Sequence, residues 1–300
     1  MTPLQRLRSA TRLGILFSGG SSRCIFQVGV MEALHELGIQ PSVCLGVSGG
    51  AWNAAAVAVG NVQRLRAYWR FFWRMPYLDL RNLLREHSPF IWSRLHERAF
   101  ERYVGNERIR ATTTLPLYVA LTRLRDRTSM IFDVRESADP LRLLIASNYL
   151  PPFFTHAPRL EGERYGDGGF SDNLPYESLF DLGCDAVIVL ASKGESEGGL
   201  FRNREDYDHV ISNPFRDRVV VIRPRHRLPL GFVERRWERL APIANLGSRR
   251  TREILLGEED TDYVVPPGRP SPSVVFLRIR DWTRTRFDTR RATNDTPPRS

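Results

Sequence analysis

The sequence has little lysine and little cysteine. A single lysine, Lys193, stands among 44 basic residues, so the positive charge is almost entirely arginine. The three cysteines (Cys24, Cys44 and Cys184) are scattered and odd in number, which predicts free thiols rather than a disulfide framework. Because no Cys-x-x-Cys pair or Cys/His cluster occurs, we expect no zinc site.

No segment has the properties of a membrane span or of a secretory signal. No window approaches the run of about 18 apolar residues that a transmembrane helix needs, and the N-terminus lacks the apolar stretch of a signal peptide. We therefore expect a cytoplasmic protein, with peripheral attachment to membranes left open.

The chain carries a formal net charge of +10 over 300 residues. Such a charge attracts a protein to anionic surfaces, and phospholipid membranes and nucleic acids are both of this kind. The arginines are spread along the chain, and no zinc finger, RNP-like motif or clear helix-turn-helix pattern accompanies them. We therefore expect no nucleic-acid partner and keep contact with an anionic membrane as the open alternative.

Apolar segments typical of strands alternate with segments typical of helices. This alternation predicts an α/β fold of three layers, α/β/α, with a largely parallel central sheet. Helices are expected after the glycine-rich segment 18–23, after Ser48 and after Pro175. The expected strands are 13–17, 43–47, 117–121, 130–132, 186–190, 219–222 and 274–277.

The most informative motif is Gly46-Val47-Ser48-Gly49-Gly50, a G-x-S-x-G pentapeptide between a short apolar run and a segment of small, helix-compatible residues. Strand, sharp turn and helix form the setting of a nucleophile elbow. The glycines would let strand and helix approach closely, and Ser48 would lie at a helix N-terminus, which favours negative charge on oxygen. Such a pattern also occurs in ordinary loops, so the motif alone leaves both interpretations open.

A second glycine-rich turn, Ser18-Gly19-Gly20-Ser21-Ser22-Arg23, joins an apolar strand to a helix. Consecutive backbone N–H groups at such a turn suit an oxyanion or a phosphate. No Gly-Lys-Ser/Thr follows and G-x-G-x-x-G is absent, which argues against a nucleotide site. An oxyanion hole for acyl transfer fits better, with a plain tight turn as the alternative.

A third turn, Tyr165-Gly166-Asp167-Gly168-Gly169, encloses a carboxylate between glycines. A serine nucleophile needs a base, and none of the six histidines is an obvious one. Asp167, which follows Ser48 by 119 residues, is the natural candidate, although turn chemistry alone also explains an aspartate here.

In order and spacing, these three segments resemble the patatin-like phospholipase family of lipid acyl hydrolases. The likeness covers about residues 12–192 and includes the stretches 146–154 and 172–175. The resemblance implies a patatin-like fold and a Ser–Asp dyad, with Ser48 as nucleophile and Asp167 as base. It places the oxyanion hole on Gly19, Gly20, Ser21 and Arg23. It assigns the glycines of the nucleophile elbow and of the dyad turn to Gly46, Gly50, Gly168 and Gly169.

Two positions depart from the family pattern. Ser21 stands where the family usually has a third glycine, and Cys24 stands where a glycine follows the arginine. An N–H hydrogen bond survives at position 21 only if φ is negative or if the fold holds a strained left-handed residue. We therefore expect a slightly reshaped oxyanion loop. Loss of one oxyanion donor costs about 3 kcal/mol, which slows an enzyme without abolishing its activity.

Composition also divides the chain into segments. Residues 64–103 mix large aromatic side chains with arginines and are expected to form a helical cap packed on the core, with insertion in a lipid interface as the alternative. Residues 232–256 are expected to form a helix that covers the sheet or the site. The other expected divisions are an N-terminal extension at 1–11, an acyl hydrolase domain at 12–283, a mobile loop at 193–213 and a disordered basic tail at 284–300.

The resemblance implies hydrolysis of lipid esters, as a phospholipase A or carboxylesterase, through an acyl-enzyme intermediate and without a metal or other cofactor. Because the base is a carboxylate, activity should fall in acid. An α/β-hydrolase triad of Ser48, Asp167 or Asp206, and His209 or His226 stays open, since its order along the chain is also Ser…Asp…His. A weakened scaffold that only binds membrane or nucleic acid is the non-enzymatic alternative.

Overall fold

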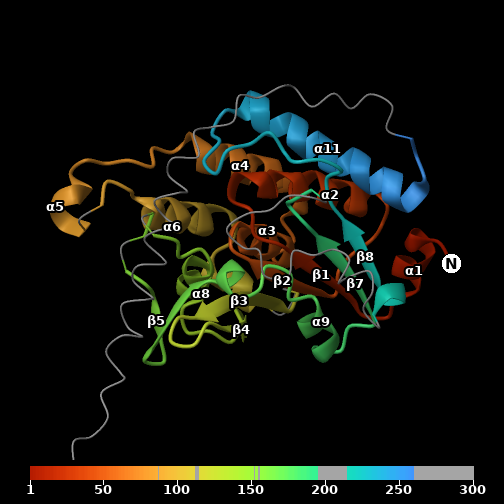
Figure 1. Cartoon of the computed structure of the whole chain (residues 1–300), viewed down its shortest axis with the longest axis horizontal. Helices are drawn as coiled ribbons and strands as arrows, with labels where there is room; N and C mark the ends of the chain where they lie inside the picture. Colours follow the sequence, from red (N-terminus) through yellow and green to blue (C-terminus); the bar gives the residue numbers. More distant parts are fainter. Residues whose placement is uncertain (87, 112–114, 152, 155, 195–214, 260–300) are drawn as a thin grey trace, which may run out of the picture.

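The computed structural model describes residues 1–86, 88–111, 115–151, 153–154, 156–194 and 215–259. These residues form a mixed, mostly parallel sheet with helices on both faces (Figure 1), which confirms the expected α/β fold. The expected strand at 274–277, most of the expected loop at 193–213 and the expected tail at 284–300 lie outside the described residues.

Within the described residues the sheet has eight strands, in the order β5-β6-β3-β2-β1-β7-β8, with β4 paired to β3. Its parallel strands are β8 (Val219–Ile222), β7 (Ala186–Leu190), β1 (Leu13–Phe17), β2 (Val43–Val47) and β3 (Leu117–Arg123). The antiparallel strands are β4 (Thr128–Asp133), β5 (Arg159–Leu160) and β6 (Glu163–Asp167).

Strands β2 and β6 share one edge of β3, and this arrangement positions the site. β4 pairs with β3 along residues 118–123, so it occupies the other edge. β2 pairs in parallel with residues 117–120 of β3, and β6 pairs antiparallel with residues 121–123. Because β6 runs toward the carboxyl end of β2, the last residues of the two strands, Val47 and Asp167, pair with neighbouring residues of β3 and lie near each other.

The side chains of the central strands alternate between the two faces of the sheet. Ile15 and Phe17 belong to a large hydrophobic core, whereas Leu16 belongs to a smaller core on the other face. The large core includes side chains of α2 (Ile25–Glu36), α3 (Gly49–Ala58) and α11 (Trp237–Leu256). The smaller core includes side chains of α9 (Glu177–Asp181).

Two helices next to α3 carry aromatic side chains into the large core. They are α4 (Leu65–Arg74) and α6 (Trp92–Tyr103), and the indole of Trp69 donates to buried Asn53 of α3 at 2.8 Å. The remaining helices are α1 (Pro3–Ser9), α5 (Asn82–Glu86), α7 (Asn106–Arg110) and α8 (Pro140–Ser147), with 3-10 turns η1 (Ser21–Cys24), η2 (Val62–Arg64), η3 (Gly168–Phe170) and η4 (Arg216–Arg218). None of the helices in the described ranges combines the length and the hydropathy needed to cross a bilayer.

Gly29 allows α2 and α11 to touch through their backbones. A Cβ at this position would lie 1.6 Å from the carbonyl oxygen of Ala244, which cannot move without moving α11. Gly29→Ala is therefore expected to destabilise the protein by about 1–3 kcal/mol or more, as overpacking does. The measurement is the free energy of unfolding in urea. An ordinary helical glycine would give the opposite sign, since alanine is the better helix former by about 1 kcal/mol.

Candidate active site

Ser48 is the residue at which the chain turns from β2 into α3. Its φ of 51° and ψ of −130° lie outside the regions that residues with a side chain prefer, and such strain is typical of functional sites. At Gly46 an added Cβ would lie 2.4 Å from the Cα of Ala51. At Gly50 it would lie 2.3 Å from the carbonyl oxygen of Phe17. Both glycines therefore permit the close approach of strand and helix that the turn requires.

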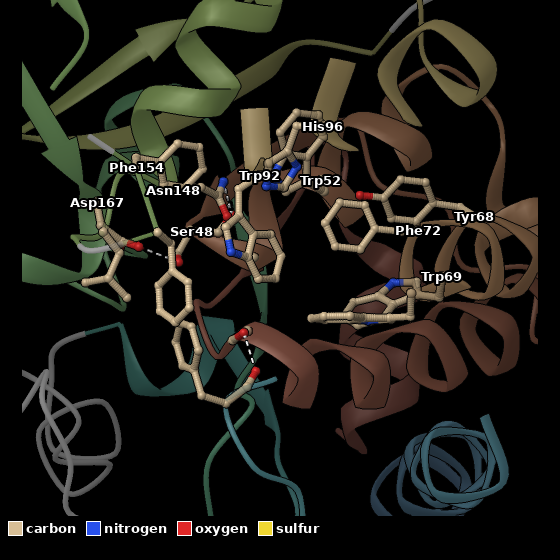
Figure 2. Close-up of a pocket in the computed structure, with 16 residues that line it drawn as sticks. Ser48, Trp52, Tyr68, Trp69, Phe72, Trp92, His96, Asn148, Phe154 and Asp167 are labelled. Atoms are coloured by element: carbon tan, nitrogen blue, oxygen red, sulfur yellow. Dashed lines mark hydrogen bonds between the residues drawn. The ribbon is translucent and has the colours of Figure 1, made fainter. Parts of the chain in front are cut away.

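Asp167 is the last residue of β6 and forms a direct hydrogen bond with Ser48. The serine hydroxyl donates to Oδ2 of Asp167 at 2.6 Å (Figure 2). The other carboxylate oxygen, Oδ1, accepts the N–H of Gly169 at 2.9 Å, and the Thr122 hydroxyl donates to the Asp167 carbonyl oxygen at 2.7 Å. At Gly168 a Cβ would lie only 2.3 Å from the carbonyl oxygen of Ala120, so the turn also needs a glycine there.

Asp167 is only 1% exposed. Burial raises the pKa of Asp167 to about 7, against the lowering effect of the hydrogen bonds from Ser48 and Gly169. The group is therefore ionised above neutral pH, where it can accept the proton of the serine hydroxyl.

Two residues at the end of α8 hold the strained turn in place. The N–H of Ser48 donates to Oγ of Ser147 at 2.9 Å, and that hydroxyl donates in turn to the carbonyl oxygen of Ala120 at 2.9 Å. The side-chain amide of Asn148 donates to the carbonyl oxygen of Ser48, also at 2.9 Å. In the sequence, Ser147 and Asn148 stand out only as part of the stretch 146–154 that resembles the family. Their role as supports of the turn comes from the structure.

The glycine-rich turn lies beside Ser48, but its residues have different roles. The N–H of Gly19 donates to Oδ1 of Asn173 at 2.8 Å and is therefore already engaged. Gly20 packs against Ser192: a Cβ added to Gly20 would lie 2.6 Å from the Cβ of Ser192. Arg23 lies in η1 and is not among the residues that line the cavity next to Ser48.

Ser21 lines the cavity with Ser48 and has a φ of 52°. The departure from glycine is thus accommodated as a strained left-handed serine, whose hydroxyl donates to the carbonyl oxygen of Phe232 at 2.6 Å. Gly49 also lines the cavity. Ser21 and Gly49 are each the first residue of a helical turn, where the backbone N–H has no acceptor within the helix. These two N–H groups are therefore candidate donors for an oxyanion.

Cys24, the second departure, is buried and lies behind the turn. Its Sγ donates to the carbonyl oxygen of Ser18 at 3.5 Å, and burial raises the pKa of the thiol to about 12. The thiol is therefore protonated at neutral pH and packs as a small apolar group. All three cysteines are free, as the sequence predicted, and the structure shows that all three are buried.

A cavity with about 580 Å³ of space, part of which is open to solvent, adjoins Ser48 and Asp167 and is lined mainly by aromatic rings (Figure 2). Its walls come from α3, α4, α6, the segment after α8 and the segment before α11. Besides the residues discussed above, the lining consists of Trp52, Tyr68, Trp69, Phe72, Trp73, Trp92, His96, Leu150, Phe153 and Phe154. The aromatic lining is that of a site for an apolar group.

His96 is the histidine of this cavity, and the sequence did not single it out. Its ring stacks on Trp52 at 4.4 Å between centroids, and burial lowers its pKa to about 3. The ring is therefore neutral at physiological pH, and the Ser48 hydroxyl donates to Asp167 with no histidine between them. Of the histidines in the open triad alternative, His226 is described but is not among the lining residues, whereas His209, like Asp206, lies outside the described residues.

Four buried nitrogens of the cavity lining have no hydrogen-bond partner within the described part of the chain. They are Nε1 of Trp52, Trp73 and Trp92 and Nδ1 of His96. An unsatisfied buried polar group costs about 1–3 kcal/mol, so these nitrogens are a cost within the cavity wall. Elsewhere, no three His, Cys, Asp or Glu side chains of the described ranges are grouped as metal ligands.

Comparison with solved structures supports the fold. VipD from Legionella pneumophila superposes with a TM-score of 0.50 at 14% sequence identity, over 82% of this chain and 67% of that chain.

Comparison of sequences identifies the family. Lysophospholipase NTE1 of Saccharomyces cerevisiae is 24% identical over 284 residues, which are 92% of this chain and 15% of that protein. Patatin-like phospholipase domain-containing protein 2 of Mus musculus is 27% identical over 201 residues, 62% of this chain and 38% of that protein. The chain thus spans less than half the length of either relative. The family model described as Patatin-like phospholipase matches residues 15–180. Because this match covers more than half of the chain and contains the hydrogen-bonded pair Ser48 and Asp167, the chain belongs to the patatin-like phospholipase family.

Proposed function

We propose that this protein is a serine esterase that hydrolyses acyl esters of lipids, as a phospholipase A or carboxylesterase. The observation that carries the proposal is the 2.6 Å hydrogen bond from Ser48 to Asp167 beside a cavity lined by aromatic rings. Membership of the family supports the same chemistry. The names of the two relatives, a lysophospholipase and a phospholipase domain protein, favour lipid esters as the substrate class.

In the first half of the reaction, Asp167 takes the proton of the Ser48 hydroxyl while Oγ attacks the ester carbonyl. The carbonyl oxygen becomes an oxyanion, which accepts hydrogen bonds from the N–H groups of Ser21 and Gly49 and benefits from the N-terminus of α3. Asp167 then gives its proton to the departing alcohol oxygen as the carbon–oxygen bond breaks. The products of this half are the free alcohol and an acyl group esterified to Ser48.

In the second half, Asp167 takes a proton from water, and the hydroxide formed attacks the acyl carbonyl. The same N–H groups stabilise the second oxyanion. The bond to Oγ breaks, Ser48 recovers its proton from Asp167, and the fatty acid leaves. No step uses a metal, so a chelator is expected to leave the rate unchanged.

The test is hydrolysis of a graded set of p-nitrophenyl esters and of phospholipid vesicles in the presence of a chelator. The native protein should release p-nitrophenol, and Ser48→Ala should reduce the rate to background. The aromatic cavity favours medium or long acyl chains over acetyl, since it offers apolar surface beyond the reacting carbonyl. Lack of turnover on every ester would contradict the proposal.

Two single substitutions separate the dyad from a histidine triad. His209→Gln and His226→Gln should each leave turnover within about threefold of the native rate, because a carboxylate base needs no histidine. Loss of activity of about 10⁴-fold in either variant would establish a triad instead, since removal of a triad member has an effect of this size.

The pH dependence of the reaction reports the state of Asp167. Because its pKa is raised to about 7, kcat/KM should be constant at higher pH and fall tenfold per pH unit below it. The measurement is a pH–rate profile on a soluble ester that does not itself titrate. A profile that stays flat down to about pH 5 would show that the base has an ordinary carboxyl pKa, contrary to the buried environment described above.

A further inference from the structure

Exposed leucines are concentrated on one short segment of the molecule. Six large hydrophobic side chains are exposed in the described part of the chain, and four of them are leucines within residues 78–84. Leu80 is 75% exposed and Leu84 is 90% exposed. Single exposed leucines are ordinary on protein surfaces, whereas a group of four marks a surface that binds something.

These leucines are presented by an arm, residues 75–86 and 88–91, that is itself folded. The N–H of Asp79 donates to the carbonyl oxygen of Pro89 at 2.8 Å, and the N–H of Ile91 donates to that of Tyr77 at 3.1 Å. Asn82 is buried within the arm, and its amide donates to the carbonyl oxygens of Ser88 and Phe90 at 3.0 Å each. Figure 1 shows α5 at the tip of this arm, apart from the rest of the described fold. The leucines therefore stand on a braced support with no core to cover.

The arm begins and ends at the wall of the cavity beside Ser48. It follows Trp73 at the end of α4 and leads into Trp92 at the start of α6, and both side chains line the cavity. Phe90 of the arm packs against the lining residue Phe153 at 4.9 Å between ring centroids. Arg235 fixes the base of the arm, donating to the carbonyl oxygens of Trp73 and Met75 at 3.0 and 2.8 Å. The segment that carries the leucines is thereby joined at both of its ends to the wall of the cavity beside Ser48.

Positive charge accompanies the leucines. Arg74, Arg81 and Arg94, one before, one within and one after the arm, are exposed and have no ion-pair partner among the described residues. Residues 64–103 contain nine arginines and four acidic residues, within a chain of net charge +10. Exposed leucines flanked by unpaired arginines are complementary to one kind of surface in particular, in which apolar chains lie beneath anionic headgroups.

We propose that the arm inserts Leu80 and Leu84 into the surface of an anionic phospholipid membrane while Arg74, Arg81 and Arg94 contact the headgroups. Docking in this way sets the cavity at the membrane surface. The inference rests on the proposed function only in taking the ester substrate to lie in the same membrane. Binding itself requires no catalysis.

The test compares variants in a Ser48→Ala background, which binds without hydrolysing the lipid. Co-sedimentation is measured with vesicles of phosphatidylcholine alone and of phosphatidylcholine mixed with phosphatidylglycerol. The parent should bind the anionic vesicles, and L80S/L84S should weaken this binding about tenfold or more, since two leucines lose their burial in lipid. R74Q/R81Q should remove much of the preference for anionic vesicles. The matched control is Leu256→Ser, an exposed leucine 40% accessible at the far end of α11, which should bind like the parent.

The same L80S/L84S change in the native Ser48 protein separates this inference from the proposed function. Hydrolysis of a short soluble ester should be unchanged, and hydrolysis of anionic vesicles should fall in parallel with binding. If the native protein hydrolyses no ester, the proposed function fails while the binding data still decide on the arm. Equal vesicle binding by the parent and L80S/L84S would overturn the inference. So would a dimer in solution that L80S/L84S dissociates while the parent binds no vesicles, because the arm would then bind a second copy.

Discussion

Replacing Asp167 with asparagine is expected to lower kcat/KM for a soluble ester by about 10³- to 10⁴-fold at about pH 8. The amide has nearly the same volume as the carboxylate and keeps an oxygen that can accept the N–H of Gly169. It cannot, however, take the proton from Ser48. The loss should appear in kcat rather than in KM, because the carboxylate contacts the nucleophile and not the bulk of the acyl chain. Steady-state kinetics on a p-nitrophenyl ester measures both.

Asp172→Asn is the matched control for this change. Asp172 is also buried and lies in the same turn, where it accepts the N–H of Leu174 at 2.9 Å, but it does not line the cavity. Its replacement should leave kcat within about tenfold of the native value, the scale of one weakened hydrogen bond. Turnover by Asp167→Asn at a level similar to that of Asp172→Asn would exclude Asp167 as the base.

The pH dependence of unfolding should show that Asp167→Asn is folded. The pKa of Asp167 is raised from 3.8 to about 7 on folding, so between these values the native protein holds a proton that the unfolded chain releases. The native protein should therefore lose stability as the pH rises from about 4 to 7. Asp167→Asn lacks this titration. From about pH 4 to about pH 8, the stability of Asp167→Asn should therefore change more favourably than that of the native protein. Thermal melting at both pH values measures the difference and shows that the inactive variant is folded.

The sequence predicted the central strands because each is a continuous apolar run between turn residues. Strands β1, β2, β7 and β8 have the bounds expected from hydrophobicity alone. β3 and β4 are longer than predicted, since their outer residues, such as Arg123 and Thr128, are polar and pair through the backbone. β6 was not predicted, because Glu163-Arg164-Tyr165 has no apolar pattern and joins the sheet only through its partner β3.

The candidate site was predictable as far as motifs identify residue types. Ser48 and Asp167 could be singled out, but their contact depends on β2 and β6 meeting on one edge of β3, which no local pattern specifies. The start of α8 carried a readable signal, since Asp139 caps it and Pro140 occupies its first turn. The hydrogen bonds that link Ser48 with Ser147 and Asn148 join residues about 100 positions apart, so only the fold reveals them. The raised pKa of Asp167 likewise results from burial that several elements produce together.

Gly19 offers a test of the nucleophile's position that removes none of the functional groups of the site. Gly19→Ala would set a Cβ 2.8 Å from the Cβ of Ser48 and 2.7 Å from Oδ1 of Asn173. One of these neighbours must move, and the N–H bond from Gly19 to Asn173 ties the glycine-rich turn in place, so we expect Ser48 to be displaced from Asp167. A displacement of about 1 Å in an active site can cost about 10²-fold in rate.

Gly19→Ala is therefore expected to lower kcat about 10²-fold, with KM little changed because the aromatic cavity is untouched. Gly166→Ala is the matched control: the closest neighbour of its Cβ would be Cδ2 of Leu124 at 2.9 Å, a side-chain end that can rotate away, so its effect should be much smaller. The pH profile separates displacement from loss of the base. Asp167 stays buried in Gly19→Ala, so the reduced rate should still fall below about pH 7, as in the native protein. A native kcat in Gly19→Ala would mean that the turn yields without moving Ser48. A low rate with no inflection near pH 7 would mean that the substitution had changed the environment of Asp167 instead.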